Sequence, residues 1–101
     1  MTINEIYVLE EAAQDLNEGK DFYERNETGI GLYFWDYMVS EFESLYLYAG
    51  IHVKEFNFYK MITRRFPYAV YYDLKDNNVY IVGVIPMKRN PDWIKKRLGE
   101  Q

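Results

Sequence analysis

Hydrophobic positions in the first half of the chain recur mainly at the spacing of helices. Residues 3 to 9, INEIYVL, are short and rich in β-branched and aromatic types, which predicts a strand leading into a helix. From Glu10 to about Asn26, small and apolar residues recur every three or four positions, and acidic residues fill much of the remainder. This stretch is therefore predicted to be an amphipathic helix with a solvated acidic face.

A second helical pattern follows the glycine-containing stretch NETGIG, where Thr28 is a candidate cap for the new helix. Apolar residues recur at helical spacing until Gly50, and glycine commonly terminates helices. Two helices joined by so short a loop are expected to pack as an antiparallel pair.

After Gly50 the pattern changes to the period of two that is typical of strands. The stretch VKEFNFYKMIT alternates weakly and predicts one strand, whereas YAVYYDL and VYIVGVI predict two strong strands around the turn residues KDNN. The closing PDWIKKRL can form a short helix. The expected fold is α+β, in one domain over residues 1–101: an N-terminal strand, an antiparallel helix pair on one side, a mainly antiparallel sheet and a short C-terminal helical tail.

The last two predicted strands form a hairpin if Asp76 and Asn77 make a two-residue turn, because facing residues then have numbers that sum to 153. This register aligns one apolar face through the pairs Tyr68–Ile85, Val70–Gly83, Tyr72–Ile81 and Leu74–Val79. Pro67 would face Pro86, where regular pairing should stop. Beyond the prolines, the same register brings Arg64 and Arg65 close to Lys88 and Arg89.

Charge is distributed unevenly along these 101 residues, which carry a net charge of -4. Nine of the twelve Lys and Arg residues lie after residue 55, so any anion-binding site belongs to the second half. The acidic balance argues against direct binding to free DNA. The chain has no cysteine, a single histidine, His52, and no apolar run that could span a bilayer. We therefore expect a cytoplasmic protein without a metal or cofactor, in which His52 is structural or exposed.

Four cations at the open end of one hairpin repel each other unless a negatively charged group lies nearby. Two explanations are open. Neighbouring carboxylates such as Asp92 or Glu55, or water alone, could balance the charges. Alternatively, a phosphate or carboxylate of a partner could bind there, since arginine offers bidentate recognition. Lys60 could extend the basic surface or stay solvated, and Trp93 could stack on a partner or on arginine, or anchor the tail in the core.

Several stretches resemble the RelE/ParE superfamily of toxins from bacterial type II toxin–antitoxin systems. The similar segments are EEAAQDLNEGKDFYE, GIGLYFWDYMVSEFESL, the strand RFPYAVYY and the closing RNPDW, and together the resemblance covers about residues 7 to 97 in order. Each motif is loose on its own, and their combination in this order is more specific. The resemblance implies the same strand and helix order that the periodicity predicts.

The resemblance also implies alternative activities. RelE-like members cleave mRNA on the ribosome with basic residues and a C-terminal tyrosine or histidine, whereas ParE-like members inhibit DNA gyrase by binding. A nuclease of this type would use Arg65 and Arg89 for phosphate contact. No tyrosine or histidine follows Arg89, however, and only a residue such as Glu55 offers a general base. We therefore favour a ParE-like toxin associated with plasmid stabilisation, ahead of a RelE-like ribosome-dependent endonuclease or a non-toxic binding module with the same fold.

The expected partners are a cognate antitoxin and a cellular target, gyrase or the ribosome, with no membrane. The residues predicted to contact the target or the antitoxin are Lys60, Arg64, Arg65, Lys88, Arg89 and Trp93.

Overall fold

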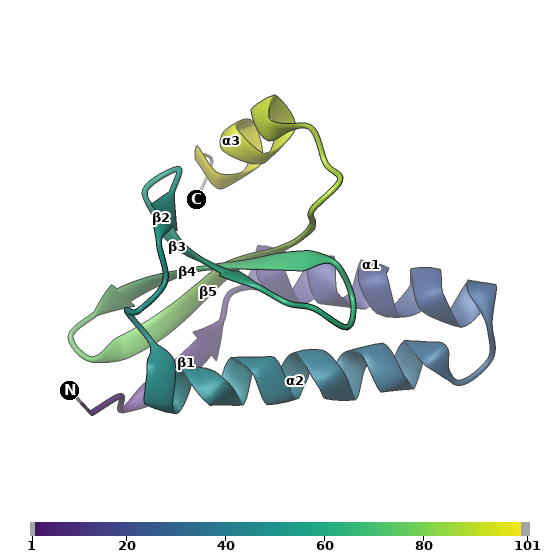
Figure 1. Ribbon diagram of the computed structural model, residues 1–101, viewed down its shortest axis with the longest axis horizontal. Coiled ribbons are helices and arrows are strands. Elements are labelled where there is room, and N and C mark those ends of the chain that lie inside the picture. Colours follow the sequence, from purple (N-terminus) through teal and green to yellow (C-terminus); the bar gives the residue numbers. More distant parts are fainter. Residues whose placement is uncertain (1, 100–101) are drawn as a thin grey trace.

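A five-stranded sheet separates a helix pair from a short C-terminal helix (Figure 1). The computed structural model describes residues 2–99. Its elements are β1 (Glu5–Val8), α1 (Glu10–Asn26), α2 (Ile30–Tyr48), β2 (Lys54–Glu55), β3 (Phe58–Ile62), β4 (Tyr68–Lys75), β5 (Asn78–Pro86) and α3 (Pro91–Gly99). The predicted α+β order and the bounds of the first helix are confirmed. The predicted C-terminal helical tail is present as α3, and it covers part of the sheet face opposite the helix pair.

The strands lie in the order β1-β5-β4-β3-β2, and only the pairing of β1 with β5 is parallel. The chain returns from β1 to its neighbour β5 only after the helix pair and three other strands. β1 pairs with β5 from Asn78 to Ile81, and the last contact is a hydrogen bond from the Leu9 amide to the Ile81 carbonyl, at 3.0 Å. From Val82 to Pro86, β5 therefore continues beyond the end of β1.

The core between the helix pair and the sheet is dominated by aromatic side chains. Phe34 is fully buried in α2, and its ring centre lies 5.1 Å from the rings of both Tyr23 and Phe66. Gly19 permits this packing, because a Cβ atom there would lie 2.6 Å from the Phe34 ring. The two helices can therefore approach closely along their small residues, and the loop after β3 inserts Phe66 against both.

A side chain of α1 caps the start of α2 across the short loop between the two helices. The predicted cap Thr28 is wrong, because the residue before α2 is Gly29, which adopts a φ of 94°. The Glu24 carboxylate accepts hydrogen bonds from the amides of Gly29 and Gly31, at 3.1 and 3.0 Å. This anion at the positive end of a helix satisfies amides that would otherwise lack partners. At the other end of α2, Gly50 adopts a φ of 95°, as its predicted role in termination requires.

The segment predicted as one strand after Gly50 folds instead into a small hairpin. β2 pairs antiparallel with β3, so that Lys54 faces Tyr59 and Glu55 faces Phe58. The two residues between the strands, Phe56 and Asn57, both have positive φ values of 57° and 70°. A left-handed phenylalanine is uncommon, which is why the sequence offers little sign of this turn.

The hairpin of β4 and β5 has the predicted turn, and its register agrees with the prediction only in the half nearest to that turn. Asp76 and Asn77 have φ values of 54° and 64°, as a two-residue turn of type I′ requires. The predicted pairs Leu74–Val79 and Tyr72–Ile81 are confirmed.

A bulge between Tyr71 and Tyr72 then shifts the register by one residue. Beyond it, Val70 faces Val84 and Tyr68 faces Pro86, so the predicted partners Gly83 and Ile85 are wrong. The predicted pairing of Pro67 with Pro86 is wrong for the same reason, and the Met87 amide donates to the Pro67 carbonyl at 2.9 Å. The bulge turns Val84 toward the helix pair and Ile85 toward α3, so that both are buried.

The second face of the sheet has a smaller core, to which α3 contributes Ile94 and Leu98. These residues are four positions apart and share one face of the helix. Trp93 lies off that face and is 41% exposed, so the alternative that it anchors the tail in the core is wrong. No helix within residues 2–99 is both long and apolar enough to cross a membrane.

Candidate binding site

A cleft of about 810 Å³ opens between α1, the end of β5 and the start of α3. We call it the α1–α3 cleft. Its floor comes from the sheet and its walls from the two helices and the turn between β5 and α3. The lining residues are Asp15, Glu18, Gly19, Phe22, Tyr23, Arg25, Pro67, Tyr68, Val84, Ile85, Pro86, Lys88, Arg89, Asn90 and Trp93.

Two of the predicted site cations lie on aromatic rings at the rim of this cleft. The Lys88 ammonium is 5.8 Å from the centre of the Phe22 ring, and the Arg89 guanidinium carbon is 4.4 Å from that of Trp93. Both rings are more than 40% exposed. Within residues 2–99, neither cation forms an ion pair with a carboxylate. Because an aromatic face occupies only one side of a cation, its hydrogen-bond donors stay available to an anionic ligand.

The turn that carries these cations is fixed by short hydrogen bonds. The Arg89 amide donates to the Pro86 carbonyl at 3.1 Å, which closes the turn directly after β5. The Asn90 side chain then accepts from the Asp92 amide at 2.7 Å, and Pro91 begins the helix. An asparagine cap followed by proline is a common start of a helix. Lys88 and Arg89 are thus held between two rigid elements.

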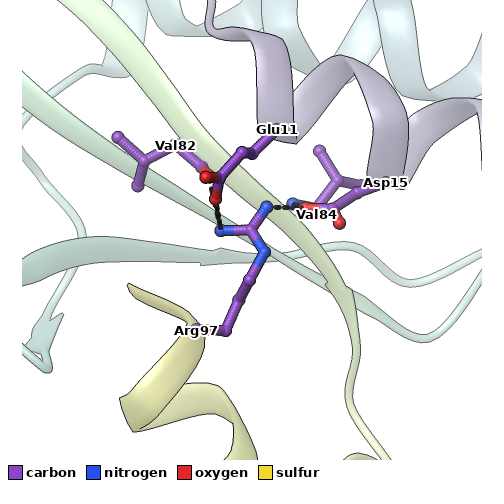
Figure 2. A network of polar contacts seen from close by, with 5 residues as sticks. All are labelled: Glu11, Asp15, Val82, Val84 and Arg97. Atoms are coloured by element: carbon purple, nitrogen blue, oxygen red, sulfur yellow. Dashed lines mark hydrogen bonds and ion pairs between the residues drawn. The ribbon is translucent and has the colours of Figure 1, made fainter. Parts of the chain in front are cut away.

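A partly buried ion-pair network adjoins the cleft through Asp15, which belongs to both. Figure 2 shows this network. Arg97 of α3 donates to the Asp15 carboxylate at 2.7 Å, and its other terminal nitrogen lies 3.0 Å from Glu11. The same side chain donates to the Val82 carbonyl at 3.3 Å, and Asp15 also accepts from the Val84 amide at 3.0 Å. This network joins α1, β5 and α3.

Burial dominates the electrostatics of Asp15. Its side chain is only 14% exposed, and desolvation raises the pKa of its carboxyl to about 6 despite the bond from Val84 and the charge of Arg97. The prediction that the acids of the first helix form only a solvated face is therefore wrong for Asp15. Neither Asp15 nor Arg97 was among the predicted site residues. The signal available in the sequence was the spacing of Glu11 and Asp15, which share one face of α1.

Two tyrosines, Tyr23 and Tyr68, contribute neutral hydroxyl groups to the lining of the cleft. Burial, together with the neighbouring Tyr23, raises the pKa of Tyr68 to about 12. Burial also raises the pKa of Tyr23 above its ordinary value. Both hydroxyls therefore remain protonated at neutral pH and can donate hydrogen bonds.

The arginines before β4 contact another helix. The Arg65 guanidinium donates to the Tyr33 hydroxyl of α2, and the amides of Arg64 and Arg65 donate to the Tyr37 hydroxyl at 3.1 and 3.2 Å. Neither arginine lines the α1–α3 cleft. The expected single group of four cations is therefore divided by its contacts into one pair beside α2 and another at the cleft. The physical reason is the tight loop before β4, in which the Thr63 hydroxyl donates to the Phe66 carbonyl at 2.6 Å.

Lys60 lies outside the cleft and has an internal partner. Its ammonium is 3.0 Å from the Glu55 carboxylate, which also accepts from the Tyr71 hydroxyl at 3.1 Å. The hydrogen bond from Lys60 is the main cause that lowers the pKa of Glu55. Glu55 is therefore a weak candidate for a general base.

The single histidine makes a structural contact. His52 hydrogen-bonds through Nδ1 with the Tyr72 hydroxyl, and burial lowers the pKa of its imidazole. Within the described residues, no three His, Asp or Glu side chains are grouped so that they could hold a metal ion.

Comparison with known proteins establishes the fold. No protein-family model matches the sequence, and no curated protein matches it significantly. The structure is similar to a solved chain described as the chromosomal ParDE TA system from P. aeruginosa, with a TM-score of 0.76 and 15% sequence identity. The similarity covers 85% of this chain and 98% of that chain. This likeness confirms the fold that the resemblance to the RelE/ParE superfamily implied.

Proposed function

We propose that this protein is the toxin of a toxin–antitoxin pair, which binds a macromolecular target such as DNA gyrase and is neutralised by a cognate antitoxin. The observation that carries the proposal is the fold, which is shared with nearly the whole length of a chain from a ParDE TA system. The order of sequence motifs and the closing RNPDW support the same assignment.

The arrangement of the cations favours binding over RNA cleavage. Arg65 and Arg89, the residues a nuclease would use, have separate contacts, since Arg65 donates to Tyr33 of α2 and Arg89 stacks on Trp93 of α3. Glu55 already accepts two hydrogen bonds. Aromatic side chains and arginine, such as the pair Trp93 and Arg89, are instead enriched at surfaces that bind proteins. The proposed contact residues are Lys88, Arg89 and Trp93 at the cleft, Arg64 and Arg65 beside α2, and Lys60.

Regulated expression in a bacterial host tests this proposal. We expect growth inhibition by the wild type, inhibition of gyrase supercoiling by the purified protein, and loss of both in the double variant R65A/R89A. Its melting temperature should change little, because exposed substitutions usually alter stability by less than about 0.5 kcal/mol. The matched control is K95A/K96A, which removes two exposed cations of α3 outside the cleft.

Two outcomes would contradict the proposal. Codon-sited cleavage of mRNA without gyrase inhibition would assign the protein to the ribosome-dependent nucleases. Normal growth at high expression would leave a binding module that shares the fold.

A further inference from the structure

The outer edge of β5 is not covered by a strand along its whole length. β1 ends opposite Ile81, whereas β5 continues to Pro86. The Val84 amide points out of the sheet edge to Asp15. The amide and the carbonyl of one residue in a strand point to the same side, so the Val84 carbonyl faces this edge as well.

Charged side chains occupy the place that a neighbouring strand would take. The Asp15 carboxylate accepts from the Val84 amide as a strand carbonyl would, and Arg97 donates to the Val82 carbonyl as a strand amide would. Charged residues commonly protect sheet edges from pairing with another chain. Here they protect only the inner part, since no side chain of this network reaches Pro86.

The α1–α3 cleft begins where this protection ends. Val84, Ile85 and Pro86 form its floor, and the half-exposed rings of Phe22 and Trp93 stand on its walls. Lys88 and Arg89 line its rim without carboxylate partners in residues 2–99. The outward carbonyl of this edge, the apolar walls and the cations Lys88 and Arg89, with Arg25 of α1 also in the lining, together fit one kind of ligand.

We propose that this cleft binds an extended peptide segment of a partner protein, in which an aromatic or large aliphatic side chain lies next to carboxylates. The apolar side chain packs against Phe22 and Trp93, and the carboxylates accept hydrogen bonds from Lys88 and Arg89. The backbone of the segment runs beside the end of β5 and donates to the Val84 carbonyl. This inference rests on the proposed function, because the antitoxin would be the source of the segment.

The acidic residues of the cleft favour a peptide over RNA. Asp15 and Glu18 line the same cleft as the cations, and the whole chain carries a net charge of -4. An oligonucleotide has a phosphate at every residue, so some of its charges would lie close to these carboxylates. A peptide has carboxylates only where its sequence puts them, and it can place neutral residues beside Asp15 and Glu18.

Selection from a random dodecapeptide library displayed on mRNA, with the immobilised full chain, tests the inference. The expected result is enrichment of peptides that carry Trp, Phe, Tyr or Leu within two residues of Asp or Glu. The best peptide should bind K88A/R89A at least about tenfold more weakly than the wild type, since two charge-assisted bonds are lost. F22A should weaken it as well, whereas K95A/K96A should bind within about twofold of the wild type.

A second measurement locates the bound peptide. In nitrogen-15 NMR spectra, the peptide should shift the Trp93 indole and the backbone amides of Val84 to Arg89, and leave the Arg65 amide beside α2 unchanged. Shifts confined to other surfaces would overturn the inference.

Other results would also overturn it. The library could yield no enriched peptides or only basic ones, or the best peptide could bind the wild type and K88A/R89A equally well. The inference would also be overturned if a single-stranded RNA hexanucleotide, and no peptide, bound in a way that requires Lys88 and Arg89. The expression test is separate from this one. Growth inhibition without peptide selection would refute the cleft inference alone, whereas peptide selection without growth inhibition would refute the proposed toxin and leave the peptide site standing.

Discussion

Arg97, in the last turn of α3, and Arg89, just before α3, differ in burial and in their charged partners. Arg97 has a side chain only 14% exposed and bonds to two carboxylates of α1 and to the backbone of β5. Arg89 lies on the half-exposed ring of Trp93 and forms no ion pair within residues 2–99. The same residue type therefore holds α3 on the sheet in one place and stays open to a ligand in the other.

The difference shows how the basic second half of the chain is used. A buried arginine needs carboxylates and carbonyls around it, because its desolvation is costly without them. A cation on an aromatic ring keeps one side in water, so it needs no internal anion. Lys60 and Arg97 have internal carboxylates, whereas Lys88 and Arg89 form no ion pair within residues 2–99. Of the two carboxylates considered from the sequence as balancing the hairpin cations, Glu55 pairs with Lys60, and Asp92 pairs with neither Lys88 nor Arg89.

The largest effect is expected when Arg97 is replaced. R97M leaves the Asp15 carboxylate buried without its cation, and we expect the free energy of unfolding at pH 7 to fall by about 2 to 3 kcal/mol. Urea denaturation measures this change. The control D15N/R97M removes both charges and should recover much of the loss. An unchanged stability of R97M would contradict the structural role of this arginine.

A smaller effect is expected from pH, with Asp15 as the cause. Burial raises the pKa of Asp15 from 3.8 to about 6 in the folded state, so the folded protein binds the proton more tightly than the unfolded chain. The stabilisation is complete below about pH 4 and is lost as the pH rises through 6. The free energy of unfolding of the wild type, relative to D15N, should therefore fall by about 2 kcal/mol between pH 4 and pH 7.

Denaturation at several pH values, with D15N in parallel, isolates this group from the other carboxyls. A relative stability that rises over the same interval would mean that the ion pair with Arg97 outweighs burial.

The smallest effect on stability is expected at Arg89. R89K keeps the charge but loses the flat guanidinium that stacks on Trp93, and its unfolding free energy should stay within about 0.5 kcal/mol of the wild type. Binding of the selected peptide should weaken by a few fold, less than in R89A, because lysine offers a point charge in place of a bidentate donor. A loss of stability as large as that of R97M would remove the distinction between the two arginines.

Local patterns were sufficient to predict most elements of the fold. The helical spacing of Ala12, Ala13, Leu16, Gly19 and Tyr23 indicated the inner face of α1, and three of these residues, Ala12, Leu16 and Gly19, are buried. The polar pair Asp76 and Asn77, which tolerates left-handed backbone, identified the turn of the last hairpin.

The bulge in that hairpin could not be predicted in the same way. The stretch VYIVGVI is apolar at nearly every position because both faces of β5 are covered, by the helix pair and by α3. Because such a run has no alternation of apolar and polar residues, it does not indicate which side of the sheet Val84 or Ile85 faces. A register without the bulge therefore paired Gly83 with Val70, the position that Val84 occupies in the structure.

The candidate site was predicted in part. The hairpin register placed Lys88 and Arg89 with Arg64 and Arg65, and Trp93 was predicted as a further contact residue. Of these five residues, Lys88, Arg89 and Trp93 line the cleft. The separation of Arg65 from them depends on the Tyr33 and Tyr37 hydroxyls of α2, which no local pattern connects to it. The pairing of Asp15 with Arg97 likewise exists only once α3 docks on the sheet.

Growth inhibition by K88A/R89A, expressed at the wild-type level, tests most directly whether these two cations serve a partner rather than the fold. We expect that this variant no longer inhibits growth although it unfolds at the wild-type temperature, while K95A/K96A inhibits growth normally. Full toxicity of K88A/R89A, or a loss of toxicity that accompanies unfolding, would contradict it.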